Sequence, residues 1–317
     1  MKHVIVAGGA GFISSHLCEN LLKKGYAVIA IDNYLTGRPE NLSLAKKTPG
    51  FHFIEADICN GFSGPKFEIL KNLKIHGVFQ MASPASPLDF DKIPFEIMQV
   101  NSVGTIQTAR FAQKQGARFI LASTSEIYGD PLVHPQPESY WGNVSSTGPR
   151  ACYDESKRFA EAYVSTMIRI EKFNAGIVRI FNTYGPRMRP DDGRIVPELC
   201  MQGLTGKPLT VHGDGLQTRS FCFVTDLVDG IIRLFESQLC EPVNIGNPIE
   251  RTVLDFAQAV RELTGSRSPI QHVPGRPEDP KRRCPDISKA RSVLHWEPKV
   301  DFREGLKRSL EYFQKCK

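Results

Sequence analysis

The first 32 residues constrain the fold of this chain more than any other part of the sequence. An apolar run at residues 3–7 leads into a glycine-rich turn and a helical stretch, and a second apolar run at residues 27–31 ends at Asp32. The order strand, glycine turn, helix, strand and acid is typical of a βαβ unit that binds a dinucleotide. Gly8 would permit the tight turn, and Gly11 would let backbone N–H groups reach a pyrophosphate at the start of the helix.

Asp32 indicates which dinucleotide is bound. A carboxylate at the end of the second strand can accept hydrogen bonds from both hydroxyls of the adenosine ribose, and it would repel a 2′-phosphate. The sequence therefore predicts NAD rather than NADP. Ser14 occupies the place of the third glycine of the fingerprint, so we expect the helix to lie slightly farther from the sheet.

The alternation of apolar runs and helical stretches continues along the chain and predicts an α/β fold with a doubly wound parallel sheet. Four more runs of strand length lie at residues 51–57, 77–82, 119–123 and 175–182, and a helical stretch covers residues 97–115. Ligands of such sheets gather at the carboxyl ends of the strands. Ala82, Thr124 and Asn182 occupy such ends, and Asp57 is either an adenine contact or a solvated acid.

The length of 317 residues exceeds what one hydrophobic core usually supports, so we expect two lobes. Residues 1–182 are predicted to form a Rossmann-like NAD-binding domain, and a helix and a strand at about residues 222–246 are predicted to return to it. Residues 183–221 and 247–317 are predicted to form a smaller C-terminal substrate-binding lobe.

Tyr153 and Lys157 are the candidate catalytic pair. They are four residues apart on a predicted helix, so their side chains share one face, and the ammonium would favour the ionised phenol, whose usual pKa is about 10. Pro149 indicates a helix N-terminus that would act in the same direction. Thr124 could hold the same substrate hydroxyl from the other side, and the three residues together predict a site that oxidises a hydroxyl group. Alternatively, Tyr153 and Lys157 are a surface pair without chemistry.

The composition excludes several other classes of function. The formal net charge of +6 comes from 40 basic and 34 acidic residues without a long basic run, which disfavours nucleic-acid binding and favours a small anionic ligand. No apolar run approaches the roughly 20 residues of a membrane span, and no signal peptide is recognisable. The eight cysteines show no metal-ligand spacing, so we expect reduced thiols, no metal and a cytoplasmic location.

These residues together resemble the extended short-chain dehydrogenase/reductase family over about residues 3–313. The shared motifs are Gly-x-x-Gly at residues 8–11, Asp32, Thr124, Tyr153-x-x-x-Lys157, the run from Arg179 to Arg187, and Leu294-x-Trp296-x-Pro298. Within that family the chain is most similar to UDP-glucuronate decarboxylases, also called UDP-xylose synthases. Three segments carry this narrower resemblance, at residues 82–87, 123–136 and 140–155. The chain departs from those enzymes at Ser156, where they mostly carry Gly, and at residues 145–147, where an Asn-Pro turn is more usual.

The resemblance implies NAD-dependent decarboxylation of UDP-glucuronate to UDP-xylose through a 4-keto intermediate, with NADH recycled in the site. Tyr153 would take the proton of the C4 hydroxyl, Thr124 would orient that hydroxyl, and Lys157 would hold the nicotinamide ribose and lower the pKa of the phenol. The resulting β-keto acid loses carbon dioxide readily because the electron pair spreads onto the ketone oxygen. Glu126 would manage a water or the C5 proton, unless it only accepts backbone hydrogen bonds. Arg283 would assist the substrate carboxylate, unless it is a surface residue.

Residue 125 helps to choose among related reactions. Sugar 4,6-dehydratases are similar at this site but carry Asp where this chain has Ser125, and a serine is a poor acid for elimination. A nucleotide-sugar 4-epimerase that uses the same Thr124, Tyr153 and Lys157 remains an alternative, ahead of a 4,6-dehydratase. A catalytically silent NAD-binding regulator would predict a damaged triad, whereas here the triad is intact.

The resemblance also implies the remaining ligand contacts. The cofactor would be held by Gly8, Gly11, Phe12, Ile13, Asp32, Asn33, Asp57, Ile58, Ala82, Tyr153 and Lys157. The UDP-sugar would be held by Ser83, Pro84, Asn182, Arg194, Val211 and Arg219. Arg219 would bind the diphosphate, because a bidentate guanidinium suits phosphate oxygens.

An apolar stripe follows the helix of Tyr153 on its other face. It consists of Phe159, Tyr163, Thr166 and Ile170. Such a stripe is usually part of the internal core. In the enzymes that the chain resembles, this face pairs with that of a second copy to form a four-helix bundle, so we expect a homodimer.

Overall fold

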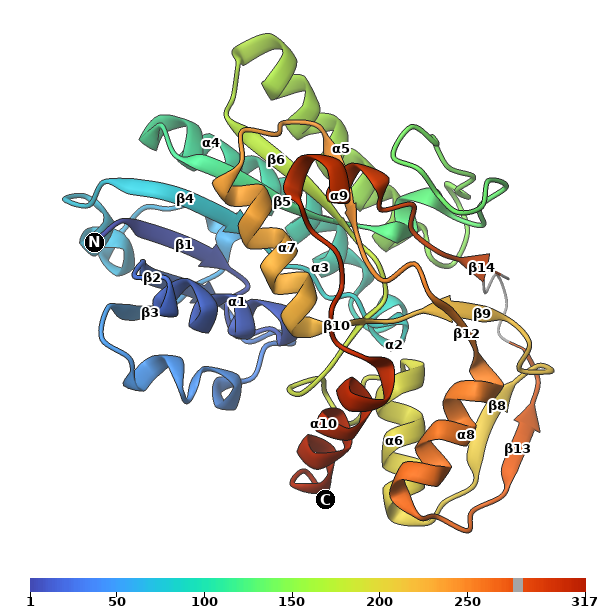
Figure 1. Ribbon diagram of the computed structural model, residues 1–317. Helices are drawn as coiled ribbons and strands as arrows, with labels where there is room; N and C mark the ends of the chain where they lie inside the picture. Colours follow the sequence, from blue (N-terminus) through green and yellow to red (C-terminus); the bar gives the residue numbers. More distant parts are fainter. Residues whose placement is uncertain (276–281) are drawn as a thin grey trace.

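Seven parallel strands form the central sheet, in the order β11-β6-β5-β4-β1-β2-β3 (Figure 1). The computed structural model describes residues 1–275 and 282–317. The strands are β1 (His3–Ala7), β2 (Ala27–Asp32), β3 (Phe51–Glu55), β4 (Ile75–Gln80), β5 (Arg118–Thr124), β6 (Ala175–Ile180) and β11 (Pro242–Ile245). The predicted doubly wound parallel sheet is confirmed. Its order reverses between β1 and β4, which is the point where such sheets bind ligands.

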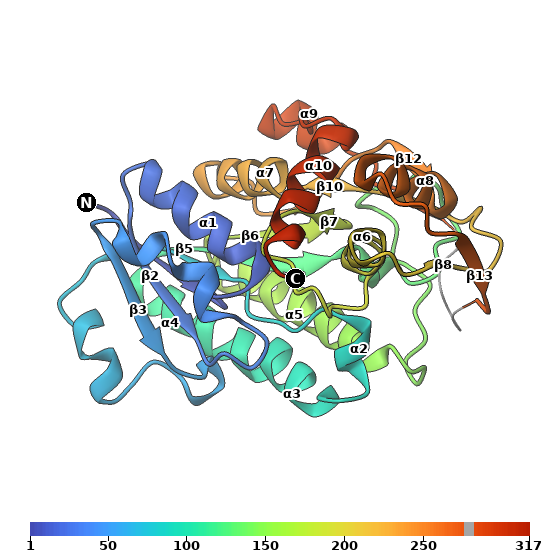
Figure 2. The same ribbon diagram turned by 90° about the horizontal axis from the view of Figure 1, so that it is seen from below.

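Helices cover both faces of this sheet, as the view from below shows (Figure 2). Helices α1 (Phe12–Lys23) and α7 (Val224–Glu236) lie on one face, and α4 (Thr105–Gln115) and α5 (Ala151–Glu171) lie on the other. The alternation of strand side chains creates two cores. Val4 and Val6 belong to one cluster, whereas Ile5 and Ala7 belong to the other. Both faces of the strands are thus buried, which explains their continuous apolar runs.

Several elements differ in detail from the sequence prediction. The strand predicted at residues 77–82 spans Ile75–Gln80, and the strand predicted at residues 175–182 ends at Ile180. The predicted helix 97–115 is α3 (Pro94–Gln99), a π-helical turn (Val100–Gly104) and α4. In that turn, the Asn101 side chain donates to the Ser156 hydroxyl of α5 over 3.0 Å. The strand predicted at residues 51–57 ends at Glu55, because Asp57 instead caps a short 3-10 turn by accepting from the Cys59 N–H over 2.8 Å.

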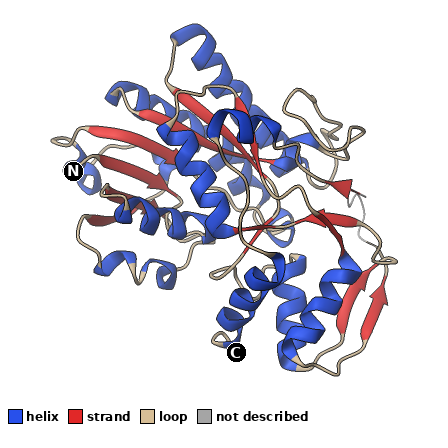
Figure 3. Cartoon of the chain, in the orientation of Figure 1, coloured by secondary structure: helices blue, strands red, loops and turns tan. Residues whose placement is uncertain are grey.

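A smaller lobe lies beside the carboxyl ends of the central strands, at the lower right of Figure 3. Its helices are α6 (Ile195–Thr205), α8 (Val253–Thr264) and α10 (Phe302–Gln314), and its strands are β8 (Leu209–His212), β13 (Ile270–Val273), β9 (Thr218–Ser220), β12 (Glu250–Thr252) and β14 (Arg282–Arg283). The chain passes between the lobes through a parallel pair, β7 (Thr183–Tyr184) and β10 (Cys222–Phe223). Helix α7 and strand β11 return to the first lobe, and α9 (Ser288–Leu294) packs on both of them before the chain reaches α10. The smaller lobe is therefore made of separate segments of the chain.

Within residues 1–275 and 282–317, no helix is both long enough and apolar enough to cross a membrane.

Candidate active site

A cavity of about 530 Å³ runs along the carboxyl ends of the central strands and reaches the smaller lobe. It brings together nearly all of the side chains that the sequence singled out. Those that line it are Gly8, Gly11, Phe12, Ile13, Asp32, Asn33, Asp57, Ala82, Ser83, Pro84, Thr124, Glu126, Tyr153, Lys157, Asn182, Arg194, Arg219 and Arg283.

Two predicted residues do not present their side chains to this cavity. Ile58 is 4% exposed and Val211 is fully buried, and both belong to the hydrophobic core. On β8 the neighbours Thr210 and His212 line the cavity instead, because successive side chains of a strand point to opposite faces. The binding roles of Ile58 and Val211 remain predictions, and any contact from these two residues would come from the backbone.

The nucleotide end of the cavity fits a dinucleotide. Gly8 has a φ of +75°, and a Cβ at this position would lie 2.6 Å from the Cα of Ala82, so no side chain is tolerated there. Gly11 caps helix α1 without a side-chain hydrogen bond, and the first turn of α1 contains no acid. The N–H groups of that turn are thus available to a phosphate group.

Asp32 lies at the end of β2 and is held by the glycine turn. Its carboxylate accepts from the N–H groups of Ala10 (2.9 Å) and Tyr34 (2.8 Å). Burial raises the pKa of Asp32, while the backbone hydrogen bonds oppose this shift. Ser14, in the first turn of α1, is 4% exposed and also lines the cavity. The expected outward displacement of α1 remains a prediction.

Tyr153 lies in the first turn of α5 and is almost completely buried. Its ring stacks on Phe90 with centroids 5.2 Å apart, and its phenol is hydrogen-bonded to the hydroxyl of Thr124. Burial raises the pKa of Tyr153, and the Thr124 hydroxyl and the Arg194 guanidinium oppose that shift. The fixed ring orientation would aim the phenol oxygen at one position of a bound substrate.

Lys157 is placed differently from our expectation. Its Nζ donates to the carbonyl of Ala122 over 2.8 Å and lies 5.9 Å from the centroid of the Tyr153 ring. Lys157 is not among the groups that lower the pKa of Tyr153 in this structure, because the ammonium points to the end of β5 rather than to the phenol oxygen. Burial lowers the pKa of Lys157 to about 7, against the raising effect of Glu161.

Glu126 lies between two arginines. Arg150 Nη2 donates to Oε2 over 2.5 Å, and Arg283 Nη1 donates to Oε1. Arg283 also donates to the carbonyl of Gly129 over 2.9 Å and is only 4% exposed, so it is not a surface residue. Burial alone would raise the pKa of Glu126, but Arg283 and Arg150 hold it well below its usual range. The carboxylate is therefore ionised and pairs with side chains rather than with the backbone.

Sequence reasoning missed Arg150. Besides Glu126 it contacts Asp154, with Nε 3.8 Å from Oδ2, and its guanidinium lies 5.5 Å from the centroid of the Phe90 ring. The available signal was its place in the Gly148-Pro149-Arg150 segment, one turn before the catalytic pair. That segment carries part of the resemblance to UDP-glucuronate decarboxylases, but the sequence analysis assigns no role to its arginine.

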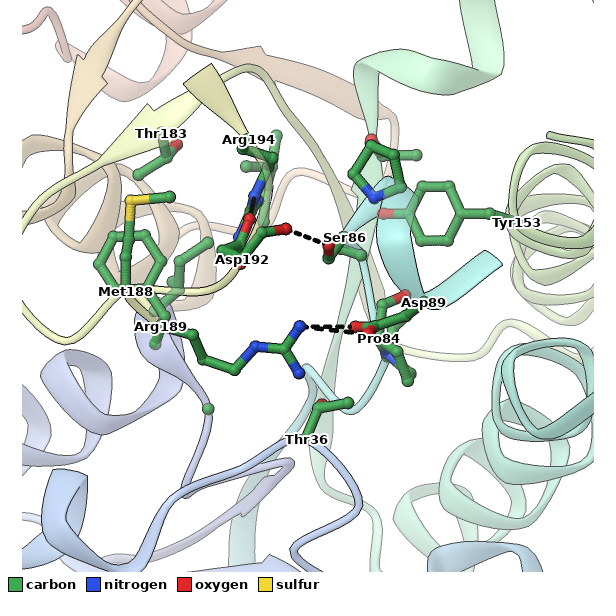
Figure 4. Close-up of a pocket in the computed structure, with 18 of the residues that line it drawn as sticks. Thr36, Pro84, Ser86, Asp89, Tyr153, Thr183, Met188, Arg189, Asp192 and Arg194 are labelled. Carbon is green, nitrogen blue, oxygen red and sulfur yellow. Dashed lines mark hydrogen bonds and ion pairs between the residues drawn. The ribbon is translucent and has the colours of Figure 1, made fainter. Parts of the chain in front are cut away.

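Two polar contacts in the wall of the cavity join loops that are remote in sequence (Figure 4). Arg189 Nη2 donates to both carboxylate oxygens of Asp89 over 3.1 Å. The Ser86 hydroxyl donates to the carbonyl of Asp192 over 2.5 Å. We call these four residues the clasp. Between the two contacts, Leu88 packs so closely on Gly193 that a Cβ at Gly193 would lie 2.3 Å from a Leu88 methyl carbon.

Arg194 lies next to the clasp. Its guanidinium pairs with Asp192, with Nη2 2.8 Å from Oδ2. Asn182 follows β6, and Arg219 lies on β9 with its Nη1 donating to the carbonyl of Thr218 over 2.8 Å. The cavity thus places cationic side chains of the smaller lobe opposite the glycine turn.

A buried polar network connects the strands and the helix that carry the catalytic residues. Ser123, the residue before Thr124, donates to Glu161, which is one turn along α5 from Lys157. Arg179 on β6 donates to both oxygens of Glu161, with distances of 3.0 Å and 2.8 Å. Its Nη1 also donates to the Tyr128 hydroxyl over 2.9 Å. This network fixes the relative positions of β5, β6 and α5.

The structure also brings together three metal-type ligands that are remote in sequence. Ligand atoms of His134, Glu250 and Cys284 lie within 4.8 Å of one another. Arg282 donates to Glu250 over 3.0 Å and lies 2.7 Å from His134 Nε2. The Arg282 guanidinium thus already pairs with Glu250 and contacts His134.

Comparisons with known proteins agree with this geometry. A family model described as the NAD dependent epimerase/dehydratase family matches residues 4–246. UDP-glucuronic acid decarboxylase 1 of Danio rerio is 44% identical over 99% of this chain and 73% of its own length. UDP-glucuronic acid decarboxylase 3 of Arabidopsis thaliana is 46% identical over 96% of this chain and 86% of its own length.

Solved structures are similar over the whole chain. A UDP-glucose 4-epimerase of Thermotoga maritima, solved with UDP-glucose, has a TM-score of 0.90 at 30% identity and covers 99% of both chains. A UDP-glucuronic acid 4-epimerase of Bacillus cereus was solved with UDP-glucuronic acid and NAD. It has a TM-score of 0.85 at 29% identity, over 99% of this chain and 100% of that one.

Proposed function

This chain belongs to the NAD-dependent epimerase/dehydratase family, and from that premise we propose that it decarboxylates UDP-glucuronate to UDP-xylose. The observation that carries the proposal is the pair of guanidinium groups, Arg150 and Arg283, which line the same cavity as the Tyr153 phenol. A uronate differs from a neutral hexose by one carboxylate, and guanidinium groups are the side chains best suited to bind it.

The cofactor is NAD, and the residues at the nucleotide end fit it. Gly8, Gly11 and the first turn of α1 would hold the pyrophosphate, and Asp32 would accept the hydroxyls of the adenosine ribose. When bound, NAD supplies the reversible oxidation of the sugar at C4. Lys157 would bind the nicotinamide ribose, with its Nζ anchored on Ala122.

Tyr153 would take the proton of the C4 hydroxyl, and Thr124 would orient that hydroxyl by hydrogen bonding. The 4-keto uronate that results is a β-keto acid. Its C5–C6 bond breaks, carbon dioxide leaves, and the electron pair moves onto the ketone oxygen before C5 takes a proton. Arg283 would hold the departing carboxylate. Ser125 offers no acid for a leaving hydroxyl, which disfavours dehydration.

Glu126 would act in this cycle as an anion. Its two arginines keep it ionised, so it would orient a water or Arg283 rather than donate a proton of its own. Asn182, Arg194 and Arg219, together with Ser83 and Pro84, would bind the UDP portion across the two lobes. These side chains line the cavity opposite the end that would bind the cofactor.

We also propose the domain division expected from the sequence, with residues 1–182 and about 222–246 binding NAD and residues 183–221 and 247–317 binding the nucleotide sugar. The sheets support it, since β11 completes the large sheet while β9, β12 and β14 form a separate one, but α9 packs on α7 and β11 and so lies against the first lobe. A cytoplasmic location is proposed as well, and it is supported by the eight cysteines, all of which are free thiols.

A homodimer is proposed from the outer face of α5. Phe159 and Ile170 are 43% and 67% exposed, and Phe95 and Met98 on the adjacent α3 are 79% and 46% exposed. Phe159 and Ile170 of the stripe on α5 are therefore not internal core, whereas Tyr163 packs partly against it. A second copy packing its α3 and α5 against these helices would bury all four side chains in a four-helix bundle.

The test of the reaction is incubation of the purified protein and NAD with UDP-glucuronate, followed by mass spectrometry of the products. Release of carbon dioxide and formation of a UDP-pentose are expected. Formation of UDP-galacturonate without loss of mass would instead identify an epimerase. Replacing Tyr153 by Phe should lower kcat by roughly 10²- to 10⁴-fold while NAD binding is retained. Full activity of Tyr153→Phe would show that another residue handles the proton.

A further inference from the structure

Asp154 is a buried carboxyl group that the proposed reaction does not use. It follows Tyr153 on α5 and is 5% exposed. Its Oδ2 lies 3.8 Å from Arg150 Nε, and its Oδ1 has no hydrogen-bond partner. Because an unpaired buried carboxylate oxygen is costly, the position calls for a reason other than stability.

Asp154 belongs to a chain of four ion-paired side chains. Arg150 and Arg283 contribute two positive charges, and Glu126 and Asp154 contribute two carboxyl groups. Three of the four residues, Arg150, Arg283 and Glu126, line the cavity, whereas Asp154 lies behind Arg150. If both acids are ionised, the set is neutral without substrate. A uronate adds a third carboxylate, which the two guanidinium groups cannot balance.

We propose that Asp154 is a positioning residue that takes up a proton when the carboxylate of a uronate substrate enters beside Arg150 and Arg283. The proposal rests on the proposed function, because it requires a substrate that carries a carboxylate. Protonation of Asp154 frees Arg150 from one of its two carboxyl partners, so that its charge can be directed to Glu126 and the substrate. Neutral sugar nucleotides would produce no such change.

The groups that face Asp154 support this assignment. Burial raises the pKa of Asp154 to about 7, Glu126 and the neighbouring Glu155 act in the same direction, and Arg150 and Arg283 oppose it. Tyr153 and Cys152, on the same helix, also face it. A further anion in the cavity shifts the balance toward the protonated acid. Asp154 is thus placed where a single added charge decides whether it is protonated near neutral pH.

The proton balance of the reaction is consistent with this role. When the C5–C6 bond breaks, carbon dioxide leaves as a neutral molecule and the negative charge stays on the sugar as an enolate. Protonation of C5 then removes that charge, so each turnover consumes one proton. Once the charge is gone, the set of Arg150, Arg283, Glu126 and Asp154 is balanced with Asp154 ionised again. Asp154 is assigned the charge balance and not the transfer to C5, because it does not line the cavity.

The test uses the Tyr153→Phe variant with bound NAD, in which ligands bind while turnover is strongly slowed. Titration calorimetry in buffers of different ionisation enthalpy near pH 7 measures the protons taken up on binding. With UDP-glucuronate we expect a fractional uptake of up to one proton per site, and with UDP-glucose we expect none. Adding Asp154→Asn should abolish the uptake with UDP-glucuronate. Asp229→Asn is the matched control, because it makes the same substitution on α7, where the side chain is 45% exposed and is not among the groups that act on Asp154, and it should leave the uptake unchanged.

Two results would overturn the assignment. Uptake that persists in Asp154→Asn would place the titrating group elsewhere, and equal uptake with both ligands in the parent would show that the carboxylate is not the cause. The second result does not depend on whether Asp154→Asn folds. Failure of the proposed function is a separate outcome, since it would appear as absence of carbon dioxide release from the unmodified enzyme.

Discussion

At the scale of single residues, burial and charged neighbours set the protonation state of each functional group. Burial favours the neutral forms of Tyr153 and Lys157, whereas Glu126 stays ionised because two guanidinium groups outweigh its burial. The site therefore contains one fixed anion between two fixed cations, next to a phenol held by Thr124. A carboxylate substrate would enter an environment whose charges are already in place, which reduces reorganisation during the reaction.

The raised pKa of Asp154 predicts a pH-dependent change in stability. The folded protein binds the proton of Asp154 more tightly than the unfolded chain, so this group destabilises the fold increasingly as the pH rises from about 3.8 to about 7. Asp154→Asn should remove this cost, and its melting temperature relative to the parent should rise between about pH 4 and about pH 7 and then level off. Thermal unfolding across that range measures it. A stability difference that is independent of pH would contradict the assignment.

The buried pair of Arg179 and Glu161 predicts a large loss of stability on substitution. Their side chains are only 10% and 12% exposed, so Glu161→Gln leaves a guanidinium buried without its counter-charge. The free energy of unfolding should fall by about 3–5 kcal/mol, measured by chemical denaturation. Glu262→Gln is the control, since Glu262 pairs with Arg303 at 58% and 57% exposure and should change little. Equal effects of both substitutions would refute this account.

At the scale of elements, the loops that follow β4 and β7 meet across the cavity. Helix α2 (Pro87–Phe90) contributes Asp89 to the clasp and is preceded by Ser86, and Arg189 and Asp192 come from the segment before α6. The close contact of Leu88 with Gly193 requires that the two loops approach without an intervening side chain. The clasp therefore joins the two loops where both of them line the cavity.

Breaking the clasp should weaken retention of the substrate. The Asp89–Arg189 pair is 10% and 23% exposed, and its loss through Arg189→Gln should raise KM for UDP-glucuronate by about three- to tenfold. It should also increase the share of 4-keto pentose released, measured by mass spectrometry. Asp191→Asn is the control, because Asp191 lies 3.9 Å from Arg189 and is 87% exposed. If both variants behave like the parent, the clasp does not retain ligand.

At the scale of the whole molecule, the two lobes complete one site, and helix α5 serves two surfaces. One face of α5 carries Tyr153 and Lys157 toward the cavity, and the other carries the exposed Phe159 and Ile170. Packing of a second copy against the outer face would stiffen the helix that positions the phenol. Assembly and catalysis would then depend on the same element.

The proposed dimer predicts the effect of charges on that face. Phe159→Glu combined with Ile170→Glu should convert the dimer to a monomer, measured by light scattering during size-exclusion chromatography. Leu216→Glu is the control, since Leu216 is 63% exposed on the smaller lobe, and it should leave the oligomeric state unchanged. A monomeric parent protein would contradict the proposal.

The sequence by itself determined the elements and the nucleotide half of the site. Helix α7 spans residues 224–236, within the stretch 222–246 where a helix is predicted, because local apolar periodicity specifies a helix without reference to distant residues. The turn from Gly8 to Gly11, Asp32, and the spacing of Tyr153 and Lys157 are likewise local signals. The direction in which the Lys157 ammonium points is not a local signal, because its acceptor, the carbonyl of Ala122, lies 35 residues earlier on β5.

The tertiary structure decided which charges meet. Arg283 and Glu126 are 157 residues apart in sequence, and Arg189 and Asp89 are 100 residues apart. No periodicity in the sequence relates such positions, because their contact depends on how the smaller lobe and the loops pack against the carboxyl ends of the sheet. Burial, which sets the pKa of Asp154 and Lys157, is a property of that packing. The chemistry of each side chain is local, but its protonation state and its partners come from the folded whole.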